Sequence, residues 1–342
     1  MVQAFTPGRS ASPLAPAAAT RLADPRAIQA LQTLLDQPGS QRLAVVGSSK
    51  NAGKTTTLNA LLAVCAARGE IAGLVSLGRD GEAFDAWLDF PKPQVRVEKG
   101  TLLVTAASAA GRAGRLLDTL LTLESTSALG ANVLARARAP GGVELCGVPH
   151  RSAVVEAVQA LQACGAQRVL VDGAYHRQAA VHPKVADAVV VAVGALLGDD
   201  PALAAQAAWP TLWALSRPTW DGAAAAVAWT GGLTDASLPA VWAQTAALAS
   251  QAGAQPLLLA ADPSRLLISE CGIAQLQARG VQVAVRHPVP LLAVTTNPLR
   301  PGGSDADPLQ WLDAVARLLS DRGLAAVPVL DVVTGERRQF AG

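Results

Sequence analysis

A glycine, a lysine and three threonines lie between a short apolar segment and a helix-forming segment near the start of the chain. Residues 42–57 read RLAVVGSSKNAGKTTT. In such a turn, Gly53 lets successive backbone N–H groups point inward around phosphate oxygens, and the positive end of the following helix faces the same oxygens. Lys54 supplies a charge for the β- and γ-phosphates, and the Thr55 hydroxyl can bind Mg²⁺. The spacing therefore predicts a phosphate-binding loop with a nucleoside triphosphate and Mg²⁺ as ligands.

This loop departs from the usual pattern at one position. The pattern G-x-x-x-x-G-K-[ST] requires its first glycine at Ser48, whereas the glycine of this chain is Gly47. A plain strand–turn–helix connection with a chance GKT is the alternative, but a strand before and a helix after are the context that the motif requires. The residues expected to hold the nucleotide are Ser49, Lys50, Asn51, Ala52, Gly53, Lys54, Thr55 and Thr56.

Two polar residues inside the loop have less specific roles. Lys50 either adds a second cation for the γ-phosphate, reaches a partner's nucleotide or faces solvent. Asn51 is expected to stabilise the backbone of the loop.

Phosphoryl transfer also needs a carboxylate near Mg²⁺, usually at the end of a strand beside the loop strand. Asp172 fits this position, since mostly apolar residues precede it in RVLVDGA and a glycine follows it. A turn- or helix-capping aspartate is the alternative. We expect Asp172 to be the acidic Mg²⁺ residue, known as the Walker B acid.

A second acidic segment, GRDGEAFD, follows the predicted strand at residues 71–78. Its place in the chain is that of the switch region of many P-loop proteins, where a carboxylate binds Mg²⁺ or orients the attacking water. Asp80 and Glu82 are the candidates, with Asp80 also a candidate metal ligand. A solvated turn before an acid-rich helix start is an equally weighted alternative.

Asn297 ends the late apolar segment PLLAVTTNP. Base-recognising asparagines of related nucleotide-binding folds occupy such a position, and an amide can both donate to and accept from a purine edge. The alternative is a turn-forming residue before Pro298. The GTP-specific N-K-x-D motif is missing because Pro298 and Leu299 follow, so ATP is expected and GTP stays open.

Composition excludes several function classes. Net charge is +2 and only 16% of the residues are charged, which argues against nucleic-acid binding. The longest apolar run, 188–197, is too short to span a bilayer, and the N-terminus lacks a signal-peptide pattern. A loop flanked by His176 and His182 is expected to be a polar surface rather than a metal site. Four scattered cysteines indicate a reducing cytosol, so a cytoplasmic location is expected: Cys65, Cys146, Cys164 and Cys271.

Predicted strands and helices alternate along the chain from residue 42. Such alternation predicts an α/β fold of the P-loop NTPase type, a mostly parallel sheet with helices on both faces. One β-hairpin insertion is expected at Gly100. The predicted helices are 26–37, 54–68, 113–123, 151–164, 263–279 and 308–321. The predicted strands are 43–47, 71–78, 95–99, 101–107, 131–137, 143–148, 168–173, 186–194, 256–260, 281–285, 290–297 and 325–332.

Three regions are expected along the chain. Residues 1–25 are rich in Ala, Pro, Ser and Thr and are predicted to be a disordered tail. Residues 26–198 form the predicted nucleotide-binding core, and residues 199–342 form an α/β continuation or a second subdomain. The Trp- and Ala-rich stretch 200–245 has no clear pattern.

Four segments together resemble one family. They read GSSKNAGKTTTLNALL, GLVSLGRDGEAFD, VDGAYHRQAAVHPKVADAVVVAVGALL and LLAVTTNPLRP. On these residues the chain resembles the P-loop subunit of the lysine 5,6-aminomutase reactivase. The molybdopterin-guanine dinucleotide biosynthesis protein B family has a similar K-N-[SA]-G-K-T loop, but it is much shorter and does not account for the ADAVVVAVGA block or the late TTNP strand.

This resemblance implies a role in repairing another enzyme. Lysine 5,6-aminomutase uses adenosylcobalamin and pyridoxal phosphate, and its radical chemistry occasionally destroys the cobalamin. The reactivase is thought to use ATP to release damaged cobalamin, together with a second subunit that resembles MutS-type ATPases. Carried across, Lys54, Thr55 and Asp172 become the nucleotide and Mg²⁺ residues, and Asp80 with Glu82 forms a switch.

Three functions stay open at this point, ranked as follows. The first is a chaperone-like ATPase whose switch loop grips or releases the mutase. The second is a small-molecule kinase or ligase of the dethiobiotin synthetase type, or a nucleotide-binding protein of the molybdopterin-guanine dinucleotide biosynthesis protein B type. The third is a scaffold that binds nucleotide without turnover. P-loop proteins of this class often dimerise across the nucleotide, so a homodimer is a further alternative.

Overall fold

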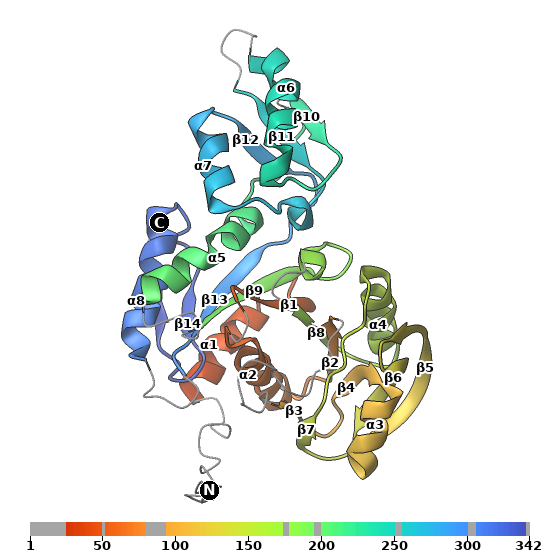
Figure 1. Cartoon of the computed structure of the whole chain (residues 1–342). Helices are drawn as coiled ribbons and strands as arrows, with labels where there is room; N and C mark the ends of the chain where they lie inside the picture. Colours follow the sequence, from red (N-terminus) through yellow and green to blue (C-terminus); the bar gives the residue numbers. More distant parts are fainter. Residues whose placement is uncertain are drawn as a thin grey trace, which may run out of the picture.

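A computed structural model of the chain describes residues 25–49, 52–78, 94–173, 178–194, 200–223, 225–249, 255–299 and 306–339 (Figure 1). Its α-helices are α1 (Pro25–Leu35), α2 (Lys54–Ala67), α3 (Ala107–Ala113), α4 (Arg151–Ala163), α5 (Pro201–Leu215), α6 (Leu238–Ala249), α7 (Glu270–Ala278) and α8 (Pro308–Asp321). The predicted tail at 1–25 lies almost wholly outside the described residues. None of the described helices is long and apolar enough to cross a membrane.

The strands form one large sheet and two small ones. They are β1 (Arg42–Gly47), β2 (Ala72–Leu77), β3 (Val95–Val97), β4 (Leu102–Ala106), β5 (Leu117–Ser127), β6 (Gly130–Ala137), β7 (Gly141–Val143), β8 (Arg168–Gly173), β9 (Ala188–Gly194), β10 (Ala226–Trp229), β11 (Leu257–Ala260), β12 (Gln282–Val285), β13 (Leu291–Asn297), β14 (Val329–Asp331) and β15 (Arg337–Arg338). The large sheet has the order β15-β14-β13-β9-β1-β8-β2-β4-β6-β5, and its central strands from β14 to β4 are parallel.

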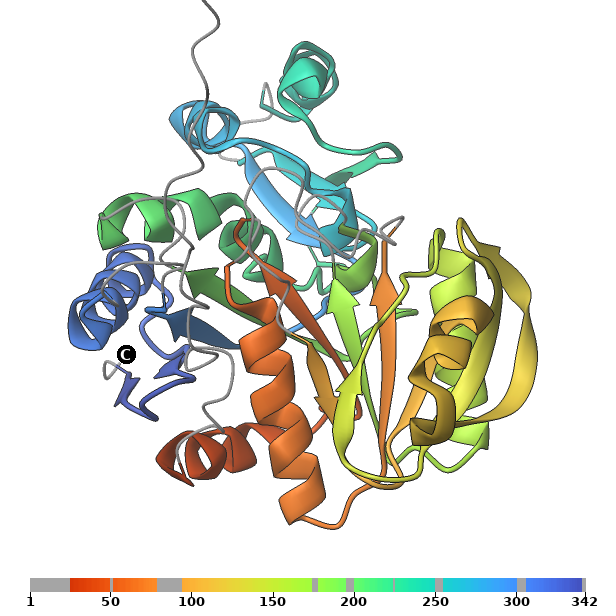
Figure 2. The same ribbon diagram turned by 60° about the horizontal axis from the view of Figure 1, so that its bottom comes forward.

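Helices cover both faces of the large sheet, as the alternation of apolar segments predicts. α1 and α2 pack on one face, around Leu43, Leu61 and Leu170. α4, α5 and α8 pack on the other, around Val171, Val191 and Leu212 (Figure 2). Central strands such as β9 are buried along their whole length, because both of their faces are covered. The mixed α/β fold with a mostly parallel sheet is therefore confirmed.

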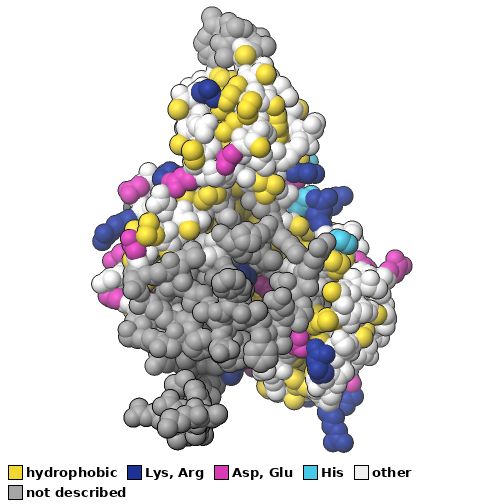
Figure 3. Space-filling model, in the orientation of Figure 1, with side chains coloured by type: hydrophobic (Ala, Val, Ile, Leu, Met, Phe, Trp, Pro, Cys, Tyr) yellow, Lys and Arg dark blue, Asp and Glu magenta, His cyan; other side chains and the backbone are white. Residues whose placement is uncertain are grey.

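A small α/β unit interrupts the large sheet between α5 and β13. Its strands pair in the order β10-β11-β12, all parallel, and α6 and α7 connect them. We call this part, residues 217–290, the inserted unit. It stands apart at the top of Figure 1, and hydrophobic side chains gather on the face seen in Figure 3. Strands β13, β14 and β15 then return to the large sheet.

The predicted hairpin at Gly100 is wrong. β3 pairs antiparallel with β7 in a separate two-stranded sheet, whereas β4 joins the large sheet between β2 and β6. Gly100 does make a turn with a φ of 93°, but β3 and β4 on either side of it pair with different strands because they differ in burial. All five residues of β4 are buried, as in a central strand, while β3 alternates between buried and exposed.

The predicted helix at 113–123 is also wrong, since its second half belongs to strand β5. Apolar residues in GRLLDTLLTL fit a helical period, yet β5 pairs antiparallel with β6 along the edge of the sheet. β5 and β6 thus form a hairpin at this edge of the large sheet, which turns at Gly130 with a φ of 104°. Of the predicted strand at 143–148, only Val143 lies in a strand, β7, which pairs with β3.

A buried arginine ties the amino edge of the sheet to α1. Arg168 at the start of β8 is 7% exposed, and its guanidinium donates to the backbone oxygens of Leu35 and Ser40 and to the Glu70 carboxylate. Burial by itself raises the pKa of Glu70, but hydrogen bonds and charge from Arg168 and Arg68 outweigh it and hold this pKa below its ordinary value of 4.5. The stabilisation from ionised Glu70 is present above that ordinary value and is lost as pH falls through the lowered pKa.

Arg168→Met removes the cation that these acceptors share. We expect the free energy of unfolding to fall by about 3–5 kcal/mol, because removing one partner of a buried ion pair leaves the other uncompensated. Urea unfolding followed by circular dichroism measures the change. Arg115→Met, at an exposed position, is the control and should stay within about 0.5 kcal/mol of the wild type. Equal losses in both variants would contradict this role of Arg168.

Candidate functional site

The predicted phosphate loop lies at the carboxyl edge of the sheet, between β1 and α2. The Ser48 amide continues the pairing of β1 by donating to Ala192 O at 2.9 Å. Gly53 precedes α2 with a φ of 92°, and its carbonyl accepts the first helical hydrogen bond from Thr57 N at 2.9 Å. A left-handed residue at this point turns the chain so that the N–H groups of the first helical turn face the loop.

Close packing explains the glycines around this loop. A Cβ on Gly53 would lie 2.5 Å from Cβ of Asn297, and one on Gly194 would lie 2.7 Å from the Ala52 carbonyl. A Cβ on Gly47 would lie 3.1 Å from Cγ of Lys54. The Lys54 side chain therefore lies back over the end of β1, where Gly47 leaves room for it. This contact gives a physical reason for a glycine one place earlier than the usual pattern has it.

The Ser48 hydroxyl of the loop is buried. Ser48 is 2% exposed, and its Oγ has no hydrogen-bond partner among the described residues. Buried polar atoms of native proteins are almost always paired with protein, water or ligand. Together with the left-handed glycine and Lys54, this atom fits a loop that holds a polar ligand such as a phosphate group.

Asp172 lies on the strand next to the loop strand, as predicted. β8 pairs with β1 on one side and with β2 on the other, so that Asp172 is in register with both Val45 and Ser76. The Ser76 hydroxyl donates to Asp172 Oδ2 at 3.1 Å, and Asp172 is half-buried. The carboxylate is thus held by a neighbouring strand at the same edge of the sheet as the loop.

Four candidate residues lie outside the described residues: Lys50, Asn51, Asp80 and Glu82. The chain enters the acidic segment at Gly78, whose amide donates to Val148 O at 3.1 Å. Leu77, the residue before it, is in register with Gly173, next to Asp172. The segment that carries Asp80 and Glu82 therefore starts beside the end of β8, which carries Asp172, and the roles of Asp80 and Glu82 stay predictions.

Asn297 touches the loop directly. It is 9% exposed, its amide nitrogen donates to the Thr56 hydroxyl at 3.3 Å, and its oxygen accepts from Leu299 N at 3.2 Å. At the next residue of α2, Thr57 and Thr295 share a hydroxyl–hydroxyl hydrogen bond of 2.8 Å. These contacts give Asn297 a bracing role on the start of α2, and base recognition by this residue stays a prediction.

Next to Asn297, a buried carboxylate fixes the end of β14. Asp331 is 1% exposed and accepts hydrogen bonds from the Thr296 hydroxyl and from two backbone amides of the following turn. Burial raises the pKa of Asp331, and these hydrogen bonds oppose that effect. Sequence reasoning missed this residue, as it missed Ser76. The available signals were an aspartate after the apolar segment 325–330 and a lone hydroxyl in the apolar strand at 71–78.

The described residues contain no group of three or more His, Cys, Asp or Glu side chains that could hold a metal ion. Mg²⁺ does not need such a group, because it keeps several waters and binds one or two carboxylates together with substrate phosphates. Thr55 in the first turn of α2 and Asp172 at the end of β8 fit this requirement. His182 is buried rather than on a polar surface, contrary to the sequence-based expectation.

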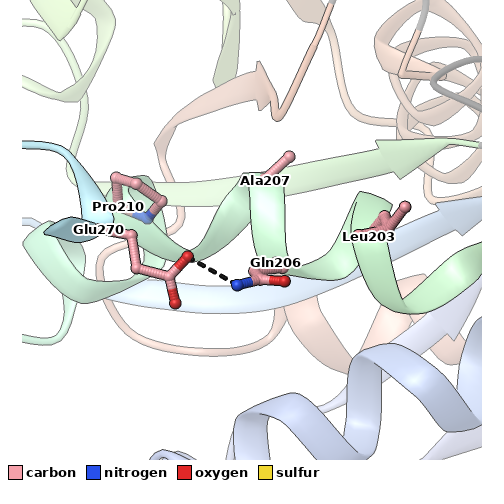
Figure 4. A pocket seen from close by; sticks show the side chains of 5 residues that line it. All are labelled: Leu203, Gln206, Ala207, Pro210 and Glu270. Atoms are coloured by element: carbon pink, nitrogen blue, oxygen red, sulfur yellow. Dashed lines mark hydrogen bonds between the residues drawn. The ribbon is translucent and has the colours of Figure 1, made fainter.

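A shallow groove away from the phosphate loop is lined mostly by residues of α5. It has a volume of about 340 Å³ and lies between α5 and α7 (Figure 4), lined by Leu203, Gln206, Ala207, Pro210 and Glu270. Gln206 donates to Glu270 at 3.0 Å. None of the predicted nucleotide residues lines this groove, so the candidate site is the loop region at the carboxyl edge of the sheet.

Gly53→Ala tests how tightly the loop is packed. We expect a loss of stability beyond the roughly 1–2 kcal/mol of a left-handed alanine, because the new Cβ meets Asn297. Gly100→Ala is the matched control, since its φ is 93° and nothing lies within 4 Å of an added Cβ. Unfolding free energies of both variants, and of Gly53→Ala in an Asn297→Gly background, measure the excess. An equal cost at Gly53 and Gly100 would show that the contact with Asn297 carries no energy.

Comparison with known proteins leaves the chain without an assigned family. No family model matches it, and neither does any curated protein or solved structure. The function is therefore inferred from the residues of the site and from their geometry.

Proposed function

We propose that the chain binds ATP together with Mg²⁺ at the loop between β1 and α2 and hydrolyses it. The observation that carries this proposal is the left-handed Gly53 between a buried strand and a helix start, with Lys54 lying over Gly47. Asp172 on the adjacent strand supports it, because phosphoryl transfer needs a carboxylate near the metal. The unpartnered Ser48 hydroxyl adds a buried donor that a phosphate oxygen would satisfy.

Each residue has a distinct role in this proposal. Backbone N–H groups around Gly53 and the start of α2 hold the phosphate oxygens, and Lys54 neutralises charge on the γ-phosphate as water attacks and the bond to ADP breaks. Thr55 and Asp172 would hold Mg²⁺, which would supply the positive charge that phosphoryl transfer requires near the β- and γ-phosphates. Ser76 keeps the Asp172 carboxylate oriented by donating to one of its oxygens.

At a finer level, we propose that this ATPase is the P-loop subunit of a reactivating factor for lysine 5,6-aminomutase. Support comes from the four segments whose sequence resembles that subunit, the phosphate loop and the ADAVVVAVGA block among them. In this role, nucleotide turnover changes the acidic segment after β2, and the change drives release of damaged cobalamin from the mutase. A MutS-like ATPase subunit is the expected partner.

Lys54→Ala should abolish ATP hydrolysis while leaving the fold intact. We expect a fall in kcat of at least about 100-fold, the usual cost of removing one preorganised charge or donor from a transition state. Release of inorganic phosphate measures turnover, and thermal unfolding checks the fold. Lys99→Ala, at an exposed position, is the control and should keep full activity. Full turnover by Lys54→Ala would overturn the proposed site.

A second assay addresses the finer proposal. Hydrolysis of ATP and of GTP is measured for the protein alone and with lysine 5,6-aminomutase and its MutS-like partner. ATP turnover that rises only with mutase and partner would support a reactivating role. Phosphate transfer to a metabolite without any protein partner would favour a small-molecule kinase, and nucleotide binding without turnover in every mixture would favour a scaffold.

A further inference from the structure

The inserted unit contacts the segment that follows Asp172 through one pair of buried side chains. His182 lies just after the short helix η2 (Gln178–Val181), and Asp262 lies just before the short helix η5 (Pro263–Arg265) of the inserted unit. His182 Nε2 is 3.6 Å from Asp262 Oδ2, and the two residues are 8% and 4% exposed. The pair thus joins the inserted unit to the large unit at a place that water barely reaches.

Local hydrogen bonds orient both partners. Lys184 N donates to His182 Nδ1 at 3.0 Å, so the neutral ring carries its hydrogen on Nε2, which faces Asp262. On the other side, Asp262 Oδ1 accepts from the amide of Ser264 at 2.9 Å and from its hydroxyl. Oδ2 is therefore the oxygen that Asp262 presents to His182.

Helix η2 packs tightly against the strands that end at the candidate site. A Cβ on Gly173, the residue after Asp172, would lie 2.7 Å from Cβ of Ala180 and 2.8 Å from Val46 Cγ1. Ala180 and Val181 are buried in the core that the sheet shares with the inserted unit. A displacement of η2 would consequently move the end of β8, and with it Asp172.

Other contacts between the inserted unit and the large unit lie away from the His182–Asp262 pair. Its chain returns to the large sheet at the start of β13, where Val189 N donates to Pro290 O at 2.9 Å at the amino edge of the sheet. Another polar contact lies on α7. Its Glu270 carboxylate accepts hydrogen bonds from Arg322, the residue after α8, and from Gln206 of α5. The contact between His182 and Asp262 is therefore the one that bears on the position of Asp172, because η2 packs against Gly173.

We propose that His182 is a positioning residue that, held by Asp262 of the inserted unit, fixes η2 and thereby the Mg²⁺ carboxylate Asp172. This inference rests on the proposed nucleotide site. In this proposal the inserted unit contributes to catalysis, because the orientation of Asp172 depends on the contact between the inserted unit and η2.

The charges around His182 add a dependence on pH. Arg151 of α4, Lys184, and Arg265 of η5 face the ring with positive charge, and Asp262 faces it with negative charge. Burial lowers the pKa of His182, the nearby cations lower it further, and Asp262 opposes them. Figure 3 shows Lys, Arg and His side chains gathered where the inserted unit meets the large unit. A proton on Nδ1 would also break its hydrogen bond with Lys184 N.

The sign of this dependence follows from the lowered pKa. The unfolded chain takes up a proton on His182 near its ordinary pKa of 6.5, while the folded chain resists it to lower pH. The seated state is therefore fully stable above that value and loses stability as pH falls below it. Turnover should fall at the lower end of this range, where the ring of the folded chain is finally protonated.

Steady-state ATP hydrolysis by the full chain tests the proposal. The kcat, the KM for ATP and the half-saturating Mg²⁺ concentration are measured from about pH 5 upward, because the pKa of His182 lies below its ordinary value of 6.5. We expect His182→Phe and Asp262→Asn to lower kcat about tenfold to a hundredfold, as misplaced catalytic groups do. We also expect both variants to raise the half-saturating Mg²⁺ concentration, because Asp172 would bind the ion less well. His182→Gln keeps an N–H toward Asp262, so it should recover most of kcat and remove the acid-side loss.

Two control variants separate positioning from general destabilisation. Asp307→Asn changes another aspartate that precedes a proline and caps a helix, with its Oδ1 accepting from Leu309 N at 2.9 Å. Glu270→Gln weakens the polar contact of α7 with Gln206 and Arg322. Both should keep the wild-type kcat and Mg²⁺ dependence. Unchanged kcat, Mg²⁺ dependence and pH profile in His182→Phe would overturn the proposal.

Hydrogen exchange distinguishes failure of this inference from failure of the proposed function. Amides of Val185 and Ala186 donate to His182 O, so their exchange reports on the segment after η2 without any nucleotide. We expect faster exchange in Asp262→Asn than in Asp307→Asn. A wild type that neither binds nor hydrolyses nucleotide would overturn the proposed function, and unchanged exchange in Asp262→Asn would overturn the contact itself.

Discussion

The chain enters α2 through the left-handed Gly53, and the side chain of Asn297 lies where a Cβ of this residue would be. Every other element of the candidate site is arranged around this contact. β9 brings Gly194 against Ala52, and β13 supplies Asn297 and Thr295 to the first turn of α2. The loop is thus held from the side of β9 and β13, while β8 on the opposite side of β1 contributes Asp172.

Two cores support this arrangement. One fills the space under α1 and α2, and the other lies between the opposite face of the sheet and the helices α4, α5 and α8. The second core continues into the inserted unit through residues such as Leu258, Val283 and Leu276. Because one apolar core is shared, the inserted unit is packed onto the sheet as well as linked to it by the chain, and its seating depends on the same burial of apolar surface that stabilises the sheet.

The sequence allowed the central elements and the loop to be predicted because their signals are local. β8 and α8 have the predicted bounds, since Asp172–Gly173 ends one apolar run and Asp307–Pro308 starts one helix. The hairpin at Gly100 and the helix at 113–123 were wrong for a different reason. A turn signal does not say which strand a segment will pair with, and the apolar spacing of β5 fits a helix until β6 is available as a partner.

Contacts between distant residues were not accessible in this way. The hydroxyl of Ser76 holds Asp172 from 96 residues away, and His182 meets Asp262 through an element that the sequence pattern did not resolve. Such pairs depend on how the strands are ordered in the sheet. Local propensity and periodicity carry no information about that order.

The separation along the chain between the loop and its brace bears on how the protein is made. Asn297 donates to Thr56 across 241 residues, and β13 takes its place beside β9 only after the whole inserted unit has been synthesised. During translation, β1 and α2 emerge long before the strand that closes their loop. The site is therefore completed late in synthesis, and a nascent chain that ends before β13 carries the phosphate-loop sequence without the contact that holds it in shape.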